Sequence, residues 1–185
     1  AHLAQNHFAE TESALKEISA ELTPELDWRR RYLLCQAKLG AGRTEEAGSE
    51  SAGLLTAATG TARLDWQAES VAFRADVLER LGRRAEAMAT LKTNLTANVP
   101  VARQRDALRQ ITALALAEGE FAVATDTLNT FVQQFSNSPA ADLALLTLGE
   151  LHLKQSAVTS DTNQLAAALG YLDQLITAFT NSPFV

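Results

Sequence analysis

Apolar side chains recur along this chain at intervals of three and four residues, the spacing that places them on one face of an α-helix. In the segment 121–135, Ala124, Leu128 and Phe131 fall on such a face and form one apolar stripe. Ala and Leu recur in a similar way after Pro139. The pattern predicts an all-α protein built from amphipathic helices that pack against one another.

A short cassette, a Gly followed five positions later by an Ala, occurs three times. We interpret each Gly as the turn between two antiparallel helices, because such a turn needs a residue that tolerates positive φ. Each Ala marks the point on the second helix where the two helices approach closely, since a larger side chain would separate them. The three copies are Gly42 with Ala47, Gly82 with Ala87, and Gly119 with Ala124.

A longer signature repeats in the C-terminal half. The segment 128–139 has the form Leu-x-x-Phe-x-x-x-Phe-x-Asn-Ser-Pro, and the segment 172–183 repeats it with Leu175 in place of Phe131. The cassette glycines lie 40 and 37 residues apart, and the two prolines lie 44 residues apart. Such a period is typical of stacked helical repeats, in which each unit buries its apolar face against its neighbours. We therefore expect one solenoid over residues 1–185.

The spacing divides this solenoid into units of one helical hairpin each. The expected units are a partial one at 1–23, complete ones at 24–61, 62–98, 99–137 and 138–181, and the start of a further one at 182–185. First helices are expected to begin near residues 26, 64, 100 and 139, and second helices near residues 44, 84, 121 and 163. Because both ends resemble interrupted helices, with residues 1–5 as the tail of one, we expect a segment of a longer array.

Local residue types predict how these helices begin. Thr44, Asp27, Asp65 and Ser138 are the expected N-caps, because short polar side chains accept a hydrogen bond from the first turn of a helix. The polar stretch 156–162 is the expected loop between the two helices of the last unit. Insertions in repeat proteins form loops that often lie on the functional face, so this loop is a secondary binding candidate.

Composition and charge limit the kinds of partner that the protein can bind. The chain is 46% hydrophobic with a formal net charge of −6. Its charges are of both signs and interspersed, which argues against nucleic acid, because nucleic-acid recognition needs a basic stripe. The run Arg29–Arg31 is interpreted as a solvated helix face rather than a phosphate site. No apolar run reaches the length of a membrane span.

Residues with catalytic or metal-binding chemistry are scattered. His2, His7 and His152 lie apart, and no His, Cys or carboxylate set has metal-ligand spacing. Cys35 is the one cysteine, and its place in a helical pattern predicts a buried, unreactive thiol. Neither a nucleophile elbow nor a phosphate-binding loop is present. We therefore expect no enzymatic activity, no metal and no cofactor.

The repeated residues resemble the tetratricopeptide repeat (TPR) family, in which a first helix, a Gly turn, a second helix with an Ala and a Pro that opens the next unit follow one another. The matches in the helices are Leu34, Ile111 and Leu148 at the large apolar position of the first helix, Gly149 at its small position, and Leu91 and Leu128 at the bulky position of the second helix. Arg74 and Ser51 depart from the pattern, since both stand where the family has an apolar residue. The motif over Phe135–Glu150 is similar to a subgroup common in bacterial periplasmic and outer-membrane-associated proteins, which implies a place in the cell envelope.

The resemblance implies an all-α, right-handed solenoid whose first helices line a concave groove. The polar and aromatic residues at the family's groove positions are Arg29, Tyr32, Gln36, Glu69, Asp76, Asp106, Arg109 and Glu150. The apolar ones are Ala72, Ala113, Leu143 and Leu146. A mixed-charge groove of this kind suits an extended peptide or a partner helix. Some family members hold chaperone C-terminal tails with a Lys that this chain lacks, so we expect no binding of such tails.

The function implied is a protein–protein interaction scaffold within a larger protein. Two alternatives remain open. The segment could be a structural spacer without a dedicated ligand groove, or it could associate with itself through uncapped ends, since terminal repeats normally carry a polar outer face.

Overall fold

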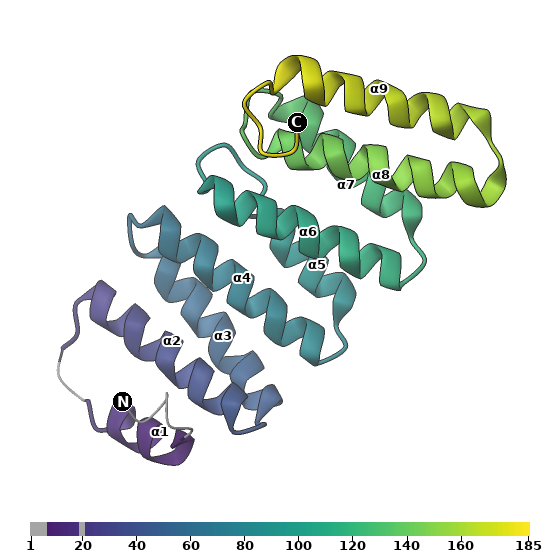
Figure 1. Ribbon diagram of the computed structural model, residues 1–185. Coiled ribbons are helices and arrows are strands. Elements are labelled where there is room, and N and C mark those ends of the chain that lie inside the picture. The colour runs from purple at the N-terminus through teal and green to yellow at the C-terminus, as the bar shows by residue number, and fades with distance from the viewer. Residues whose placement is uncertain (1–6, 19–20) are drawn as a thin grey trace. The chain divides into compact units, whose positions relative to one another are not determined.

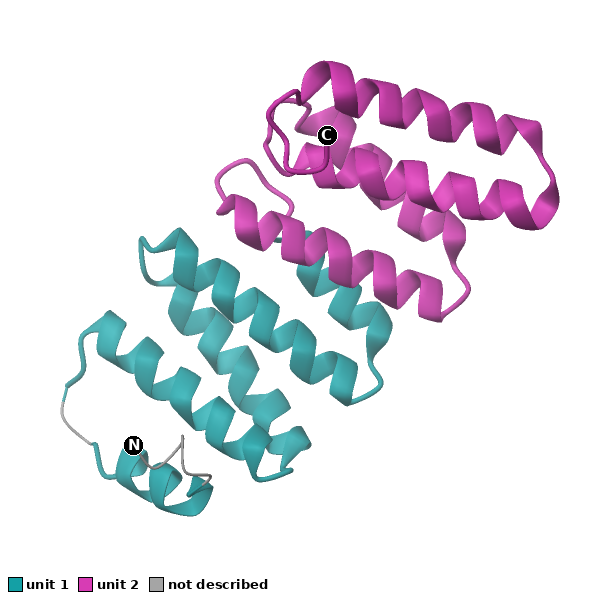
Figure 2. Cartoon of the chain, viewed as in Figure 1, with its two compact units in different colours: residues 1–94 teal, residues 95–185 magenta. Residues whose placement is uncertain are grey.

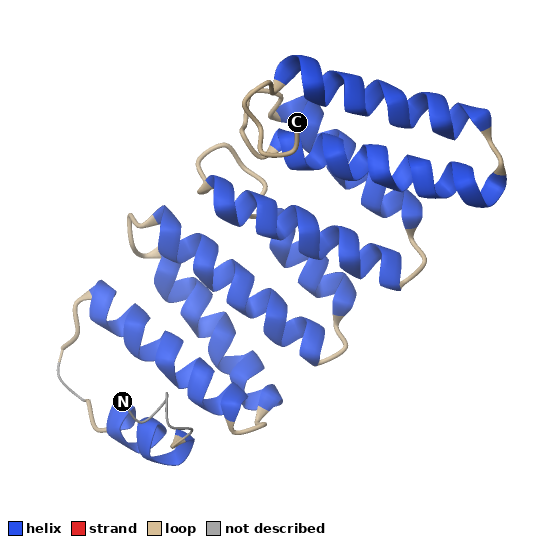
Figure 3. Cartoon of the chain, viewed as in Figure 1, coloured by secondary structure: helices blue, strands red, loops and turns tan. Residues whose placement is uncertain are grey.

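The computed structural model describes residues 7–18 and 21–185, and every regular element within them is an α-helix (Figure 1). The chain divides into two compact units, residues 1–94 and 95–185 (Figure 2). Colouring by secondary structure shows helices joined by short loops in both units (Figure 3). The expectation of an all-α protein is confirmed for the described residues. The expected helix tail at residues 1–5, and His2 within it, lie outside them.

The first unit consists of successive helices that each pack against the next. They are α1 (Phe8–Lys16), α2 (Pro24–Gly40), α3 (Thr44–Thr59), α4 (Leu64–Arg80) and α5 (Arg84–Lys92). The pairs α2–α3 and α4–α5 are helical hairpins joined by tight turns, at the places that the Gly cassette predicts.

The second unit has the same plan. Its helices are α6 (Val101–Ala117), α7 (Phe121–Gln134), α8 (Ala141–Thr159) and α9 (Thr162–Ala178). Each packs against the next, and the two first helices, α6 and α8, also touch each other.

The cassette glycines form the turns that the sequence predicts. Gly42, Gly82 and Gly119 have φ values of 75°, 74° and 75°. In each turn the Gly N–H bonds to the carbonyl three residues earlier, and the next N–H bonds to the carbonyl five residues earlier. This is the Schellman motif, which ends a helix on a left-handed residue and satisfies its last carbonyls. The partner residues Ala47 and Ala87 are fully buried, as is the third alanine of the cassette.

Several helix starts differ from the predictions. Helix α2 begins at Pro24, and Thr23 caps it by accepting a hydrogen bond from the Leu26 N–H at 3.3 Å. Asp27 therefore lies inside the first turn, as Asp65 does in α4. Thr44 is the first residue of α3 rather than its cap. A proline has a φ already suited to the first helical position, so it starts the helix ahead of the aspartate.

The last hairpin also corrects two predictions. Ser138 and Pro139 form a turn that precedes α8 instead of being its cap and first residue. The stretch 156–162 is mostly helix, because α8 continues to Thr159 and α9 begins at Thr162. The chain reverses at Ser160, which is left-handed with a φ of 56°. The longer spacing of this unit comes from two longer helices, because α8 and α9 have 19 and 17 residues where α6 and α7 have 17 and 14. The expected seven-residue loop is not present.

The two departures from the family pattern lie together in the first unit. Ser51 is fully buried and donates a hydrogen bond to the Gly48 carbonyl at 2.8 Å. Half-buried Arg74 of α4 donates to the Ser51 hydroxyl at 3.4 Å and to the same Gly48 carbonyl at 3.5 Å. A polar contact between α3 and α4 therefore replaces the apolar one, with its buried donors satisfied.

Candidate protein-binding surfaces

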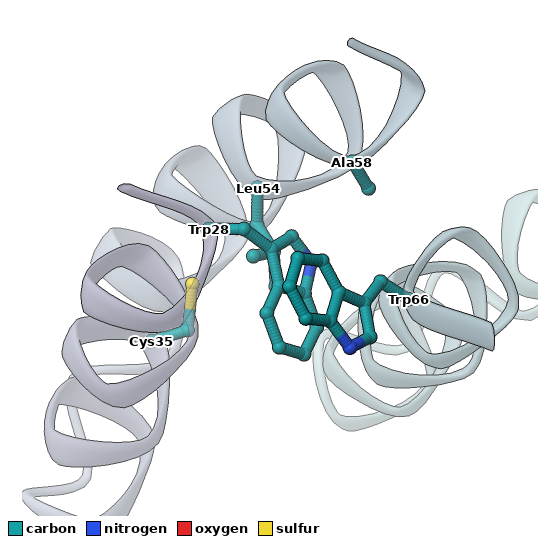
Figure 4. Packing of buried hydrophobic residues seen from close by; sticks show 5 residues of the cluster. All are labelled: Trp28, Cys35, Leu54, Ala58 and Trp66. Carbon is teal, nitrogen blue, oxygen red and sulfur yellow. The ribbon is translucent and has the colours of Figure 1, made fainter. Parts of the chain in front are cut away.

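Two stacked tryptophans join the first helices of consecutive hairpins in the first unit. Trp28 of α2 and Trp66 of α4 have ring centroids 4.6 Å apart and planes inclined by 4° (Figure 4). Both side chains are less than a tenth exposed and belong to a core cluster with Cys35, Leu54 and Ala58. Such a pair contributes about 0.5–1.5 kcal/mol beyond the area it buries. The stack therefore fixes α2 beside α4.

A buried serine completes this contact. The Trp28 Nε1–H donates to the Ser70 hydroxyl at 2.8 Å, and that hydroxyl donates to the Trp66 carbonyl, also at 2.8 Å. Ser70 is fully buried. The indole N–H, which would be costly to bury alone, is thus satisfied within the α2–α4 contact.

Tyr32 and Glu69, two of the residues expected in the groove, meet beside the tryptophans. The Tyr32 ring stacks on Trp28 at 5.3 Å and tilts against Phe73 at the same centroid distance. Its hydroxyl donates to Glu69 Oε1 at 2.8 Å. One end of the ring is therefore held by packing, and the other by a charge-assisted hydrogen bond. Both residues are half-buried.

Two arginine side chains lie over the ring of Trp66. The Arg63 guanidinium lies 4.4 Å from the Trp66 ring centroid, and that of Arg29 lies 5.9 Å from it. Arg63 also donates to both carboxylate oxygens of Asp65, at 3.0 and 2.7 Å. These hydrogen bonds lower the pKa of Asp65, because they stabilise its charged form.

The arginines of the Arg29–Arg31 run form ion pairs with acidic residues of their own helix. Arg30 and Arg31 donate to Asp27 at 3.0 and 2.8 Å, and Arg29 lies 3.5 Å from Glu25. Burial opposes the charge of Asp27, but the two arginine hydrogen bonds outweigh it and lower its pKa. Arg29 is exposed, but Arg30 and Arg31 are half-buried, so the prediction of a solvated helix face holds for Arg29 alone.

The remaining expected groove residues of the first unit lie on the same two helices. Gln36 of α2 and Asp76 of α4 are half-buried. Asp76 pairs with Arg80 one turn further on, at 3.1 Å. We call the surface formed by Arg29, Tyr32, Gln36, Glu69 and Asp76 the α2–α4 surface.

The other three expected groove residues lie in the second unit. Asp106 and Arg109 of α6 are 3.9 Å apart, and Arg103 lies 3.4 Å from Asp106. Glu150 is exposed on α8. Among the apolar positions, Leu143 is only 6% exposed, so it belongs to the core of this unit and not to a binding surface.

A buried acid that sequence reasoning missed links α6 to α8. Asp142 is almost inaccessible, and Arg105 of α6 donates to it at 2.6 Å. The Ser182 hydroxyl donates to the same carboxylate oxygen at 2.9 Å. A buried charge is tolerated when it is paired and hydrogen-bonded in this way. The signal that could have indicated it is the repeated Asn-Ser-Pro, since Ser138 likewise donates to a first helix, at Gln104.

Metal binding, membrane insertion and thiol chemistry each depend on particular side chains. Among residues 7–18 and 21–185, no group of three His, Cys, Asp or Glu side chains could hold a metal ion. No helix in the same part of the chain is both long and apolar enough to cross a bilayer. Cys35 is fully buried, and this burial, with nearby Glu50, raises the pKa of its thiol to about 12.

Comparison with solved structures shows the same fold in TPR-like repeat proteins. A kinesin light chain-like protein of Podosopora anserina, with nearly identical TPR-like repeats, matches with a TM-score of 0.61 and 14% identity, over 100% of this chain and 92% of that one. A variant of that protein with one substitution matches with a TM-score of 0.58 and 13% identity. BtubC (BKLC) from P. vanneervenii matches with a TM-score of 0.57 and 11% identity, over 98% of this chain and 75% of that one.

No family model and no curated protein matches the sequence. The structural matches show that the fold is a TPR-like α-solenoid, as the cassette and the repeat period predict. At 11 to 14% identity they show the fold alone.

Proposed function

We propose that this protein is an interaction scaffold that binds an extended peptide or a partner helix on its α2–α4 surface. The observation that carries the proposal is the Trp28–Trp66 stack, which holds two first helices side by side. A rigid pair of helices can present polar side chains in a fixed geometry, and binding then costs less ordering entropy.

The side chains on this surface suit a peptide of mixed charge. Arg29 leaves more than half of its side chain exposed and can pair with an acidic group, while Asp76 can pair with a basic one. Between them, the Tyr32 ring offers an aromatic contact that is already ordered by Trp28 and Glu69. Aromatic and arginine side chains with fixed positions contribute much of the affinity at protein interfaces.

The test uses random peptides displayed on phage, selected on the full chain. Selected peptides are then synthesised and their Kd values measured on the wild type, on Arg29→Ala/Asp76→Ala and on a matched control, Glu45→Ala/Lys92→Ala. The control also removes one charge of each sign, but from exposed positions on the second helices α3 and α5.

We expect Kd to rise at least tenfold in the first variant and less than twofold in the control. Equal loss in both variants, or no loss in either, would refute the α2–α4 surface as the binding site. Failure to select any peptide would favour a spacer or a self-associating module instead.

We further propose that the protein works without catalysis and in a bacterial cell envelope. The first part is supported by one finding: within residues 7–18 and 21–185, no group of three His, Cys, Asp or Glu side chains could hold a metal ion. The second part is supported by the Phe135–Glu150 motif alone. The gene sequence upstream of Ala1 tests it, because a leader ending in a lipid-attachable Cys would support the proposal and a leaderless start would overturn it.

A further inference from the structure

A hollow lies between the start of α2 and the end of α3, and none of its lining residues belongs to the α2–α4 surface. Its volume is about 480 Å³, within the range of small-molecule sites. Two charged side chains, Asp27 and Arg30, line it. The apolar lining residues are Ile18, Leu22, Pro24, Ala57 and Gly60.

The protein satisfies the Arg30 guanidinium only in part. Its Nη2 donates to Asp27 Oδ1 at 3.0 Å. Its Nε is buried and has no hydrogen-bond acceptor among the described residues. A guanidinium has five N–H groups, and one carboxylate can accept two of them side by side. Arg30 therefore keeps donors for a carboxylate that enters the hollow.

The ion pairs around Arg30 leave one positive charge in excess. Asp27 also accepts from Arg31 Nε at 2.8 Å, and Glu50 lies 3.7 Å from Arg31 and 3.2 Å from Lys38. This connected group has three basic and two acidic side chains, all less than one third exposed. Asp27 lines the hollow, but two guanidinium groups offset its charge. Because charges that are partly removed from water are screened less, the excess favours an anion.

The α6–α7 hairpin has an equivalent hollow without a cation, of about 310 Å³. The turn glycines of the two hairpins lie 77 residues apart, and at this spacing four pairs of lining residues correspond. The pairs are Pro24 with Val101, Asp27 with Gln104, Ala57 with Gln134, and Gly60 with Asn137. The position of Arg30 is Ala107, and no residue that lines the second hollow is charged. The hollow thus belongs to the hairpin plan, whereas the guanidinium is specific to the first one.

We propose that the hollow beside Arg30 binds a small monocarboxylic acid with an apolar body. The carboxylate pairs with Arg30, and the hydrocarbon part covers Leu22, Ala57 and Ile18, of which Ile18 is 43% exposed. A free acid is favoured over the end of a peptide, because the peptide amides would need polar partners and only Asp27 and Arg30 supply polar side chains in the lining. The proposal is independent of peptide binding on the α2–α4 surface.

The test follows the binding of hexanoate to the full chain through backbone amide chemical shifts in NMR spectra. Hexanamide has the same body without the charge, and acetate has the charge without the body. We expect hexanoate to bind with a Kd at least tenfold lower than that of either. The shifts should lie around Leu22 and Ala57. Those around Gln104 and Gln134, in the equivalent hollow, should stay unchanged and serve as an internal control.

Two variants, each with a matched control, locate the site. Arg30→Gln removes the cation, and Arg83→Gln removes another arginine that pairs with an acid three residues away. Ala57→Phe fills the hollow without a change of charge, and Ala52→Phe adds the same ring at an exposed position of α3. We expect the Kd of hexanoate to rise at least tenfold in Arg30→Gln and in Ala57→Phe, and less than twofold in the controls. The two pairs are read separately, with circular dichroism as the check of folding, so the test stands when one variant does not fold.

Four results overturn the proposal. They are no saturable binding of hexanoate, equal affinity for hexanoate and hexanamide, equal losses in a variant and its control, and equal shifts in the two hollows. Tighter binding of the peptide N-acetyl-Gly-Leu than of hexanoate, lost in Arg30→Gln, also overturns it, because the occupant would then be the end of a chain.

Discussion

Replacing Ser70 by Ala tests whether the α2–α4 contact depends on its buried hydrogen bond. The substitution removes the acceptor of the Trp28 indole N–H at a site with no access to water. It leaves the Trp66 carbonyl, the second partner of the hydroxyl, without that donor. A buried donor left unsatisfied costs about 1–3 kcal/mol. We therefore expect Ser70→Ala to lower the free energy of unfolding by about this amount.

The assay is urea unfolding followed by far-UV circular dichroism, with Trp28→Phe as the second arm of a double-mutant cycle. Trp28→Phe removes the N–H, so Ser70→Ala should cost less in that background, with a coupling of about 1 kcal/mol. Ser49→Ala is the matched control, because Ser49 is exposed on α3 and donates only to a carbonyl of its own helix. We expect the control to change stability by less than about 0.5 kcal/mol.

Two results would refute the reasoning. The first is a cost of Ser70→Ala no larger than that of Ser49→Ala. The second is an equal cost in the wild-type and Trp28→Phe backgrounds, since the serine would then act independently of the indole.

Three further predictions concern other parts of the chain. Gly82→Ala should lower stability by about 1–2 kcal/mol, measured by chemical unfolding, because an alanine must adopt a φ of 74°; an unchanged midpoint would contradict this. Hydrogen bonds from Arg43 and Lys16 lower the pKa of Glu12 from 4.5 to about 2, so the stability they add is present above pH 4.5 and is lost as the pH falls toward 2. Glu12→Gln should remove that part of the pH dependence in thermal unfolding at a series of pH values, and an unaltered profile would exclude the ion pairs as its source. The buried thiol of Cys35, whose pKa is raised to about 12, should react with a thiol reagent such as DTNB only when the protein unfolds; rapid labelling of the native protein would show that the site opens.

The turns could be predicted from the sequence because a single backbone requirement selects the residue. A left-handed helix end favours Gly, so Gly42, Gly82 and Gly119 marked the ends of the first helices. The first residue of each helix was harder to predict than the turns. Several neighbouring residues can act as the N-cap, and the sequence does not say which one does. In α2 the N-cap is Thr23 and not Asp27, because the proline between them is the first residue of the helix.

The polar stretch 156–162 shows a second limit. Its residues have the composition of a loop, yet Thr159 donates to the Gln155 carbonyl at 2.8 Å in the continuing helix. Ser156 donates to the Asp161 carbonyl across the turn at 3.0 Å. Polar side chains that bond to the backbone can thus complete an exposed helix end, and composition alone does not separate this from a loop.

The sequence predicted which helices carry the residues of the α2–α4 surface, but not which of the side chains contact one another. The repeat register put Tyr32 and Glu69 on equivalent first helices, and the two side chains are hydrogen-bonded. Trp28 and Trp66 directly follow Asp27 and Asp65, the expected N-caps, but a cap prediction says nothing about contact between the two rings. Their stacking depends on the rotamers and on the distance between α2 and α4, which the sequence does not specify.

The position of the two tryptophans allows fluorescence to follow one half of the chain separately from the other. Both belong to residues 1–94, so indole emission reports on that half, whereas residues 95–185 contribute only tyrosine and phenylalanine. Circular dichroism, by contrast, follows the helices of both halves. If the halves melt together, the two signals will coincide, and if one melts first, their separation will identify which one without any added label.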